Sequence, residues 1–217
     1  MSGARERVLA NIRAALNRKG PMTDSVTAAL DARLKTPRAN VKPAVEGDVV
    51  ERFIQKMESV HGAVTRVAAM EKVSEAVDDH LKQHGLPLEL VVAPDPGLED
   101  IRWSNRFAIE RRAASGSDRV SVTGAFAGLA ETGTLVLLSG PESPTTLNFL
   151  PDDHIVVLRV ERIVTHMEDV WARLRKERGQ MPRTVNFITG PSKTADVEQT
   201  IQEGAHGPRR LRVILVG

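Results

Sequence analysis

Apolar residues recur along the chain at two spacings, one typical of helices and one typical of buried strands. The helical spacing, with apolar residues three or four positions apart, occurs near residues 8–16, 50–57, 70–84 and 163–174. Short β-branched runs bounded by Gly or Pro occur at 63–68, 88–92, 185–188 and 211–216, with a candidate at 107–109 and three more within 120–158. Because strands alternate with helices, the pattern predicts an α/β fold with a mostly parallel sheet.

The N-terminal part of the chain has a different pattern. A basic amphipathic helix is expected over residues 8–16 and is ended by Gly20-Pro21. Residues 21–45 contain three prolines and no sustained periodicity, which predicts a linker. We therefore expect a helical arm and linker over residues 1–45 and an α/β domain over 46–217. The arm helix can pack on its own protein or on an identical subunit, or contact a partner or a membrane surface.

Composition excludes several classes of function. Aromatic residues make up 3% of the chain, there is no Tyr, and the formal net charge is only +2, so we expect no nucleic-acid partner. The absence of Cys excludes disulfides, thiolate catalysis and an iron–sulfur cluster held through Cys by this chain alone. No apolar run approaches the ~18 residues that span a membrane, and the N-terminus lacks the apolar block of a signal peptide. These features predict a cytoplasmic protein.

One acid stands out in the glycine-rich stretch between the strands of 120–158. Glu131 has Gly124, Gly128 and Gly133 around it, and an acid among buried strands is costly unless it is paired or used. Glu131 is therefore a candidate nucleophile, general base or ligand-orienting group. A structural acid that accepts backbone N–H groups in a tight turn is an equal alternative.

A second candidate site follows the strand at 185–188. The segment from Gly190 to Thr194 precedes a helix that we expect to end at Gly204, so its first-turn N–H groups and Lys193 are suited to an anion. Ser192 or Thr194 acting only as a helix N-cap is the alternative. The spacing is not that of a P-loop, and Gly124-x-x-x-Gly128 is not a dinucleotide fingerprint.

The histidines give weaker signals. His80 and His84 have the i, i+4 spacing of metal ligands, but no HExxH pattern surrounds them, and a solvated helix end is the better interpretation. We expect no metal site. His154 and His206 lie beside strands and are either proton carriers or hydrogen-bonded loop residues.

Three motifs together resemble the LUD-domain family. They are GAFAGLAETGTLVLLSGP, then LPDDHIVVL, then ITGPSKTADVEQTIQEGAHGP before a closing strand, and the resemblance covers about residues 46–217. It implies a three-layer α/β/α fold similar to the ribose-phosphate isomerase and CoA-transferase group. It also implies a setting in lactate utilization, with iron–sulfur proteins that oxidise L-lactate to pyruvate. The residues that match the family motifs are Glu131, Thr132, Gly133, Gly190, Pro191, Ser192, Thr194, Asp196, Glu198, His206, Gly207 and Pro208.

Two functions from different classes follow from this resemblance. The first is an accessory component of L-lactate oxidation whose partner proteins hold the iron–sulfur clusters. The second is an enzyme or binding protein for a small acyl-CoA, sugar phosphate or carboxylate, because CoA transferases of a related fold use a Glu two residues before a Gly, as in Glu131-Thr132-Gly133. For the second function Glu131 is the candidate catalytic residue, and the candidate ligand-binding residues are Gly124, Thr132, Gly133, Gly190, Ser192, Lys193, Thr194, Asp196 and His206.

The geometry of parallel sheets adds one expectation. If the strands at 120–123 and 185–188 are parallel members of one sheet, the segments that follow them emerge at the same edge. Glu131, Thr132 and the Ser192–Thr194 segment would then line one cleft, with Asp196 close by and an anion bound between them.

Overall fold

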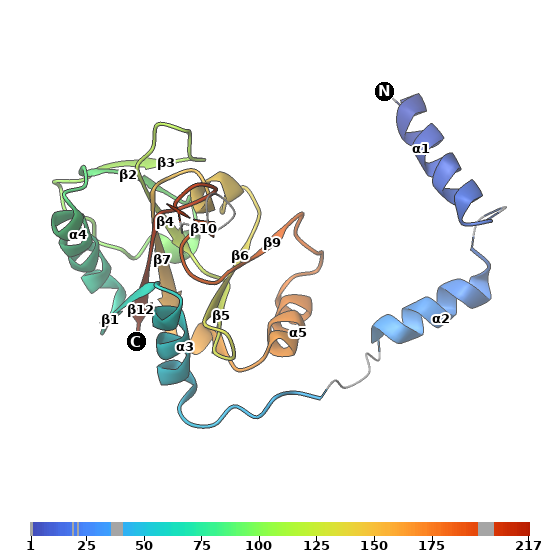
Figure 1. Ribbon diagram of the computed structural model, residues 1–217, viewed down its shortest axis with the longest axis horizontal. Helices are drawn as coiled ribbons and strands as arrows, with labels where there is room; N and C mark the ends of the chain where they lie inside the picture. Colours follow the sequence, from blue (N-terminus) through green and yellow to red (C-terminus); the bar gives the residue numbers. More distant parts are fainter. Residues whose placement is uncertain (1, 19, 21, 36–40, 195–201) are drawn as a thin grey trace. The chain divides into compact units, whose positions relative to one another are not determined.

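The computed structural model of the protein describes residues 2–18, 20, 22–35, 41–194 and 202–217. Its helices are α1 (Ser2–Ala15), α2 (Asp24–Lys35), α3 (Val49–Ser59), α4 (Val73–His84) and α5 (Met167–Glu177), with short 3₁₀ helices η1 (Met70–Lys72), η2 (Pro96–Leu98), η3 (Thr145–Asn148) and η4 (Val160–Arg162) (Figure 1). Its strands are β1 (Ala63–Val67), β2 (Glu89–Val92), β3 (Ala108–Arg111), β4 (Val120–Gly124), β5 (Ala127–Leu129), β6 (Thr134–Leu138), β7 (Asp153–Arg159), β8 (Ile163–Val164), β9 (Val185–Ile188), β10 (Lys193–Thr194), β11 (Gln202–Glu203) and β12 (Arg210–Val216).

The chain divides into two compact units, Met1–Pro43 and Ala44–Gly217. The first unit contains α1 and α2, and large apolar side chains of both helices are exposed to solvent. The second unit contains every strand that the structure describes.

The helix α2 lies where the sequence predicted a linker, so that prediction is wrong for residues 24–35. Its end signals were present in the sequence. The Thr23 hydroxyl accepts a hydrogen bond from the Val26 N–H at 3.4 Å, an acid opens the first turn, and Lys35 closes the last.

A six-stranded sheet forms the centre of the second unit. Its order is β1-β12-β7-β4-β2-β3, and every neighbouring pair is parallel. Alternate residues of the central strands pack on opposite faces, as they must in a buried parallel sheet. This arrangement confirms the expected α/β fold with a mostly parallel sheet and flanking helices.

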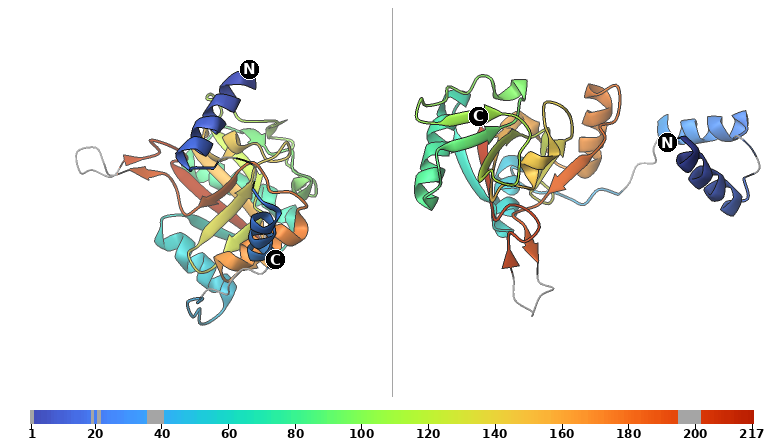
Figure 2. Two further views of the ribbon diagram at one scale, coloured as in Figure 1. Left: turned by 90° about the vertical axis from the view of Figure 1, so that its right-hand side faces the viewer. Right: turned by 90° about the horizontal axis from the view of Figure 1, so that it is seen from above.

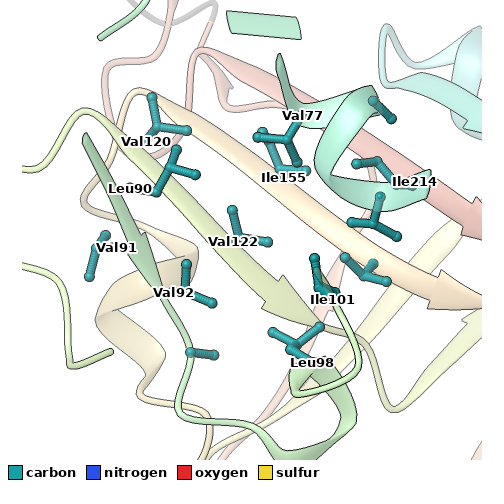
Figure 3. Packing of buried hydrophobic residues seen from close by; sticks show 14 of the residues in the cluster. Val77, Leu90, Val91, Val92, Leu98, Ile101, Val120, Val122, Ile155 and Ile214 are labelled. Atoms are coloured by element: carbon teal, nitrogen blue, oxygen red, sulfur yellow. The ribbon is translucent and has the colours of Figure 1, made fainter. Parts of the chain in front are cut away.

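The helix α4 covers one face of this sheet. Val77 of α4 packs with Ile155 and Ile214 of the sheet, and Leu98 and Ile101 extend the same cluster (Figure 3). The helix ends where Gly85 adopts a left-handed conformation, φ 60°, which lets the Leu86 N–H reach the Leu81 carbonyl.

The opposite face is covered by α3 and by a second sheet. Phe53 and Met57 of α3 pack against Val156 and Leu158 of β7, together with Leu135 of β6. The second sheet has the order β8-β5-β6-β9, and α5 covers its outer face (Figure 1). The sequence pattern did not predict this second sheet.

Two neighbouring strands of the large sheet continue into the small one. The chain passes from β4 to β5 and from β7 through η4 to β8. The Ala125 N–H donates to the Val157 carbonyl just beyond β4, and Gly128 then pairs with Ile163 in the second sheet. The small sheet is therefore an extension of the large one that folds over its α3 face.

The segment before β12 differs from its prediction. Residues 189–204 were expected to form a turn and a helix, but β10 and β11 pair as antiparallel strands, and this ribbon projects from the two sheets (Figure 2). Asp196 and Glu198 lie outside the described residues. Because Lys193 and Thr194 form the strand β10, the predicted helix N-terminus at Ser192–Thr194 is wrong.

Candidate functional site

A cleft lies at the carboxyl edge of the six-stranded sheet, where ligands bind in most open parallel sheets. The neighbouring strands β4 and β7 end there at Gly124 and Arg159, and the segment after β2 adds Asp95. The cleft encloses about 220 Å³. Its lining consists of Asp95, Gly97, Leu98, Gly124, Ala125, Phe126, Leu138, Glu142, Ser143, Val157, Arg159, Arg162, Glu177 and Arg178.

Asp95 and Gly124 form the floor of this cleft at the strand ends. One carboxylate oxygen of Asp95, Oδ1, accepts the Gly97 N–H at 2.8 Å and caps η2. The other oxygen, Oδ2, lies so close to Gly124 that a Cβ at that position would overlap it. With glycine at position 124 the Asp95 carboxylate keeps this position, whereas any side chain there would displace it.

Three arginines line the cleft, from the end of β7, from η4 and from the residue after α5. Arg162 donates to both oxygens of Glu177, at 2.9 and 2.7 Å, and its guanidinium lies 5.9 Å from the centre of the Phe126 ring. Arg159 contacts Asp100 at 3.6 Å, beyond hydrogen-bond length, and about two fifths of its side chain is exposed. Arg178 is exposed just after the last residue of α5.

The cleft therefore carries charges of both signs. Arg162 and Glu177 form an ion pair with each other, and the lining also contains two further arginines, Arg159 and Arg178, and two further acids, Asp95 and Glu142. Such a lining can bind a small polar molecule that has an anionic end and a hydrogen-bond donor. The sequence held one usable signal for these residues, since Arg159 directly follows an apolar run predicted to be a strand, and Asp95 lies three residues after another.

Glu131 lies outside the residues that line this cleft. Its backbone N–H donates to the Thr165 carbonyl, and its Oε2 is 3.3 Å from His166 Nδ1 at the start of α5. About a quarter of the Glu131 side chain is exposed, against about an eighth for His166. A carboxylate at this helix N-terminus is favoured by the helix dipole. The geometry is therefore that of a paired acid at the beginning of a helix.

Thr132 belongs to a short chain of hydroxyl groups. Its Oγ1 is 2.6 Å from that of Thr134, which is in turn 2.7 Å from that of Thr189. These bonds join the turn after β5 to the end of β9 and place the first and third family motifs side by side.

Gly133 and Gly190 both allow close contact with the last turn of α3. Both have positive φ, 69° and 83°. A Cβ on Gly133 would overlap the backbone between Lys56 and Met57, and one on Gly190 would lie 2.6 Å from the Val60 carbonyl oxygen. These two glycines, predicted to bind a ligand, are thus required for packing of the helix.

Ser192 and His206 lie in one loop cluster, where the two ends of the third motif meet. The Ser192 N–H donates to the Pro208 carbonyl at 2.9 Å, and its hydroxyl accepts the His206 N–H at 3.4 Å. Lys193 and Thr194 continue from this cluster into β10, with Lys193 exposed.

The expectation of one cleft shared by all these residues rested on a wrong premise. The strand β4 belongs to the six-stranded sheet, whereas β9 belongs to the four-stranded sheet and runs antiparallel to β6. The structure brings Thr132 near Thr189 and Ser192 near His206, and it places Gly124 in the carboxyl-edge cleft with Asp95.

Two histidines lie in the core, contrary to their description as solvated or loop residues. His80 is 3% exposed and lies 3.1 Å from the buried carboxylate of Asp153. His154 is 1% exposed, is 2.8 Å from the Thr123 hydroxyl, and has its pKa lowered to about 3 by burial. It is therefore neutral at physiological pH. Among the described residues, no group of three or more His, Cys, Asp or Glu is placed to hold a metal ion.

The comparisons with known proteins agree with the fold and the motifs. A model of the LUD domain matches residues 50–216, well over half of the chain. The chain is 39% identical over 100 residues to lactate utilization protein C of a Geobacillus species, covering 45% of this chain and 42% of that protein. It is 36% identical over 192 residues to lactate utilization protein C of an Exiguobacterium species, covering 81% of each.

Several curated relatives are matched over only about half of their own length. The crystal structure of a DUF162 family protein from Deinococcus radiodurans superposes with a TM-score of 0.59 at 23% identity, covering 81% of this chain and 100% of that chain. That similarity shows the fold alone.

In the described part of the chain, no helix is both long and apolar enough to cross a membrane.

Proposed function

The chain belongs to the LUD domain family, and on that premise we propose that it acts in L-lactate utilization, as an accessory component of an iron–sulfur-dependent oxidation of lactate to pyruvate. The oxidation releases two electrons and two protons, and the clusters of partner proteins accept the electrons. This chain binds the partners and supports their turnover without performing the oxidation alone.

One observation carries the proposal. Relatives named lactate utilization protein C match this chain, one of them at 36% identity over 81% of both proteins. The composition is consistent with the accessory role, because a chain without Cys has no thiolate with which to hold a cluster. The resemblance to the LUD-domain family is the reason for proposing iron–sulfur proteins as the partners.

A reconstituted assay tests the proposal. The partner iron–sulfur proteins are purified with and without the full chain, and L-lactate-dependent reduction of an electron acceptor is measured for each preparation. We expect the chain to copurify with the partners, to raise their rate, and to show no turnover alone. Equal rates with and without the chain would refute the accessory role.

A second candidate function is binding of a small anionic ligand. The carboxyl-edge cleft favours it, because the cationic side chains of Arg159 and Arg178 line this cleft together with the half-buried acid Asp95. The site of this candidate is the cleft around Gly124 rather than Glu131, since Glu131 is paired with His166. Equilibrium binding to the full chain, measured in turn with a sugar phosphate, an acyl-CoA and a simple carboxylate, shows which of these three ligand classes the cleft prefers.

A further inference from the structure

We propose that the carboxyl-edge cleft binds a small 2-hydroxy carboxylate, with the carboxylate group held by Arg159 and Arg178 and the hydroxyl group by Asp95. This inference rests on the proposed function, since it identifies the ligand class of a component of lactate utilization. The size of the cleft supports it. A volume of about 220 Å³ lies below the roughly 300–1,000 Å³ of pockets for drug-sized molecules, which favours a small organic acid over a nucleotide or an acyl-CoA.

The carboxylate end is assigned to the two arginines with the weakest partners. Arg162 is already bound to both oxygens of Glu177 and stacked near Phe126. Arg159 has only the long contact to Asp100, and its side chain is two-fifths exposed. Arg178 lines the same cleft. A guanidinium forms paired, charge-assisted hydrogen bonds with a carboxylate, so these two side chains suit that end of the ligand.

The hydroxyl end is assigned to Asp95. Its Oδ1 accepts the Gly97 N–H, and its Oδ2 lies against Gly124, which also lines the cleft. An ionised carboxylate only accepts hydrogen bonds, so it binds an O–H group and repels a second carboxylate or a carbonyl oxygen. Asp95 therefore orients the ligand, with its hydroxyl group toward Gly124 and its carboxylate toward the arginines.

The apolar part of the lining completes the match. Ala125 and Phe126 line the cleft and are only half-buried, so part of their apolar surface faces it. They provide a surface for a short alkyl group, such as the methyl group of lactate, beside the polar groups. A polar molecule without an alkyl group would leave this surface uncovered.

The arrangement predicts an order of affinities among acids of similar size. L-Lactate has the carboxylate, the hydroxyl and the methyl group. Propionate lacks the hydroxyl group, and pyruvate carries a carbonyl oxygen that faces the Asp95 carboxylate. We expect L-lactate to bind about tenfold or more tightly than either, which corresponds to one charge-assisted hydrogen bond.

Isothermal titration of the full chain with L-lactate, propionate and pyruvate tests the proposal at constant ionic strength. Arg178→Gln is expected to weaken L-lactate binding about tenfold or more. The matched control is Arg175→Gln, which removes the same charge from an exposed position of α5 outside the cleft lining and is expected to leave binding unchanged. Asp95→Asn is expected to lose the preference for L-lactate over pyruvate, since an amide can donate to the carbonyl oxygen.

The outcomes separate this inference from the proposed function. Equal binding of L-lactate and propionate by the wild-type chain, or no binding of any of the three acids, would overturn the inference without any variant having to fold. A loss of binding in Arg175→Gln as large as that in Arg178→Gln would also overturn it. If the chain stimulates its partners but binds none of the acids, the proposed function stands and the inference fails. If it binds L-lactate but leaves the partners unaffected, the accessory role fails instead.

Discussion

Replacement of Asp153 by Asn tests how the amino ends of the central strands are held. The Asp153 side chain is fully buried at the first residue of β7. It accepts two hydrogen bonds of 2.6 Å from Arg210, at the first residue of β12, and lies 3.1 Å from His80 Nε2. Arg212 Nε donates to His80 Nδ1, so the proton of a neutral His80 lies on Nε2 and points to Asp153.

The expected cost follows from burial of this ion pair. Removing one partner of a buried pair costs about 3–5 kcal/mol, because the other charge loses its compensation. The Arg210 side chain is about one-third exposed, and the Asn oxygen can still accept one bond, so the lower end applies. We expect Asp153→Asn to lower the free energy of unfolding by about 3 kcal/mol, and Tm by about 6–12 °C for a chain of this size.

Urea unfolding at neutral pH, followed by circular dichroism, measures this difference. Asp152→Asn is the matched control, since Asp152 is nearly half exposed and its contact with Arg119 spans 3.5 Å. Its cost is expected to stay below about 1 kcal/mol. A loss of less than about 1 kcal/mol in Asp153→Asn would refute the reasoning, because the pair would then behave like an exposed one.

The same pair predicts a dependence on pH. Burial alone raises the pKa of Asp153, but the hydrogen bonds from His80 and Arg210 and the positive charge of Arg210 lower it overall. A carboxyl group with a lowered pKa in the folded state stabilises fully above its ordinary pKa. The difference between wild type and Asp153→Asn should therefore be constant around neutral pH, begin to shrink as the pH falls below the ordinary pKa of an Asp, and be lost once the pH has fallen through the lowered pKa.

Three further predictions concern other parts of the chain. Gly133→Ala is expected to lower the free energy of unfolding by about 1–3 kcal/mol, because the positive φ of Gly133 and its contact with α3 leave no room for a Cβ. Gly140→Ala, at a position in open space, should lower it by less than about 0.5 kcal/mol, and urea unfolding measures both values. Equal losses in the two variants would contradict the packing argument. Glu131→Gln should lower Tm by only a few degrees, since its partner His166 is not fully buried, and intact stimulation of lactate oxidation by this variant would establish a structural role. Limited proteolysis should cut the chain before residue 44 and leave a 44–217 fragment that unfolds cooperatively; loss of that cooperativity would show that the arm stabilises the domain.

Local patterns predicted the elements that are built from local interactions. The helix α4 and its Gly85 cap follow from a single apolar stripe, and the strands β7 and β12 follow from short β-branched runs. The helix expected over 189–204 fails at its two ends because tertiary contacts decide them. Ser192 is bonded to the Pro208 carbonyl, and its own carbonyl accepts the Gly204 N–H. Such long-range bonds override local propensity.

The spacing of apolar residues does not predict to which sheet each strand belongs. All five residues of β6 are buried, as in a strand packed on both faces, and this pattern is the same in a large parallel sheet and in a small mixed one. For the same reason, the sequence alone did not predict which residues form the candidate site. Gly124 was found because glycine is a visible signal, but Asp95 and Arg159 come together only when β2, β4 and β7 are placed in one parallel sheet.

The passage of β4 and β7 together into the second sheet has a consequence for how the chain tolerates insertions. Side chains alternate between faces along a strand, and β5 pairs with β8 two residues out of step with the β4–β7 pairing, an even shift that keeps the same alternation of faces in both sheets. One residue added between β4 and β5 would turn Ala127 and Leu129 away from α5 and toward α3, while the larger sheet kept its pairing. Single-residue insertions are therefore expected to be excluded from the two-residue link at 125–126, where one frame of alternation serves both sheets.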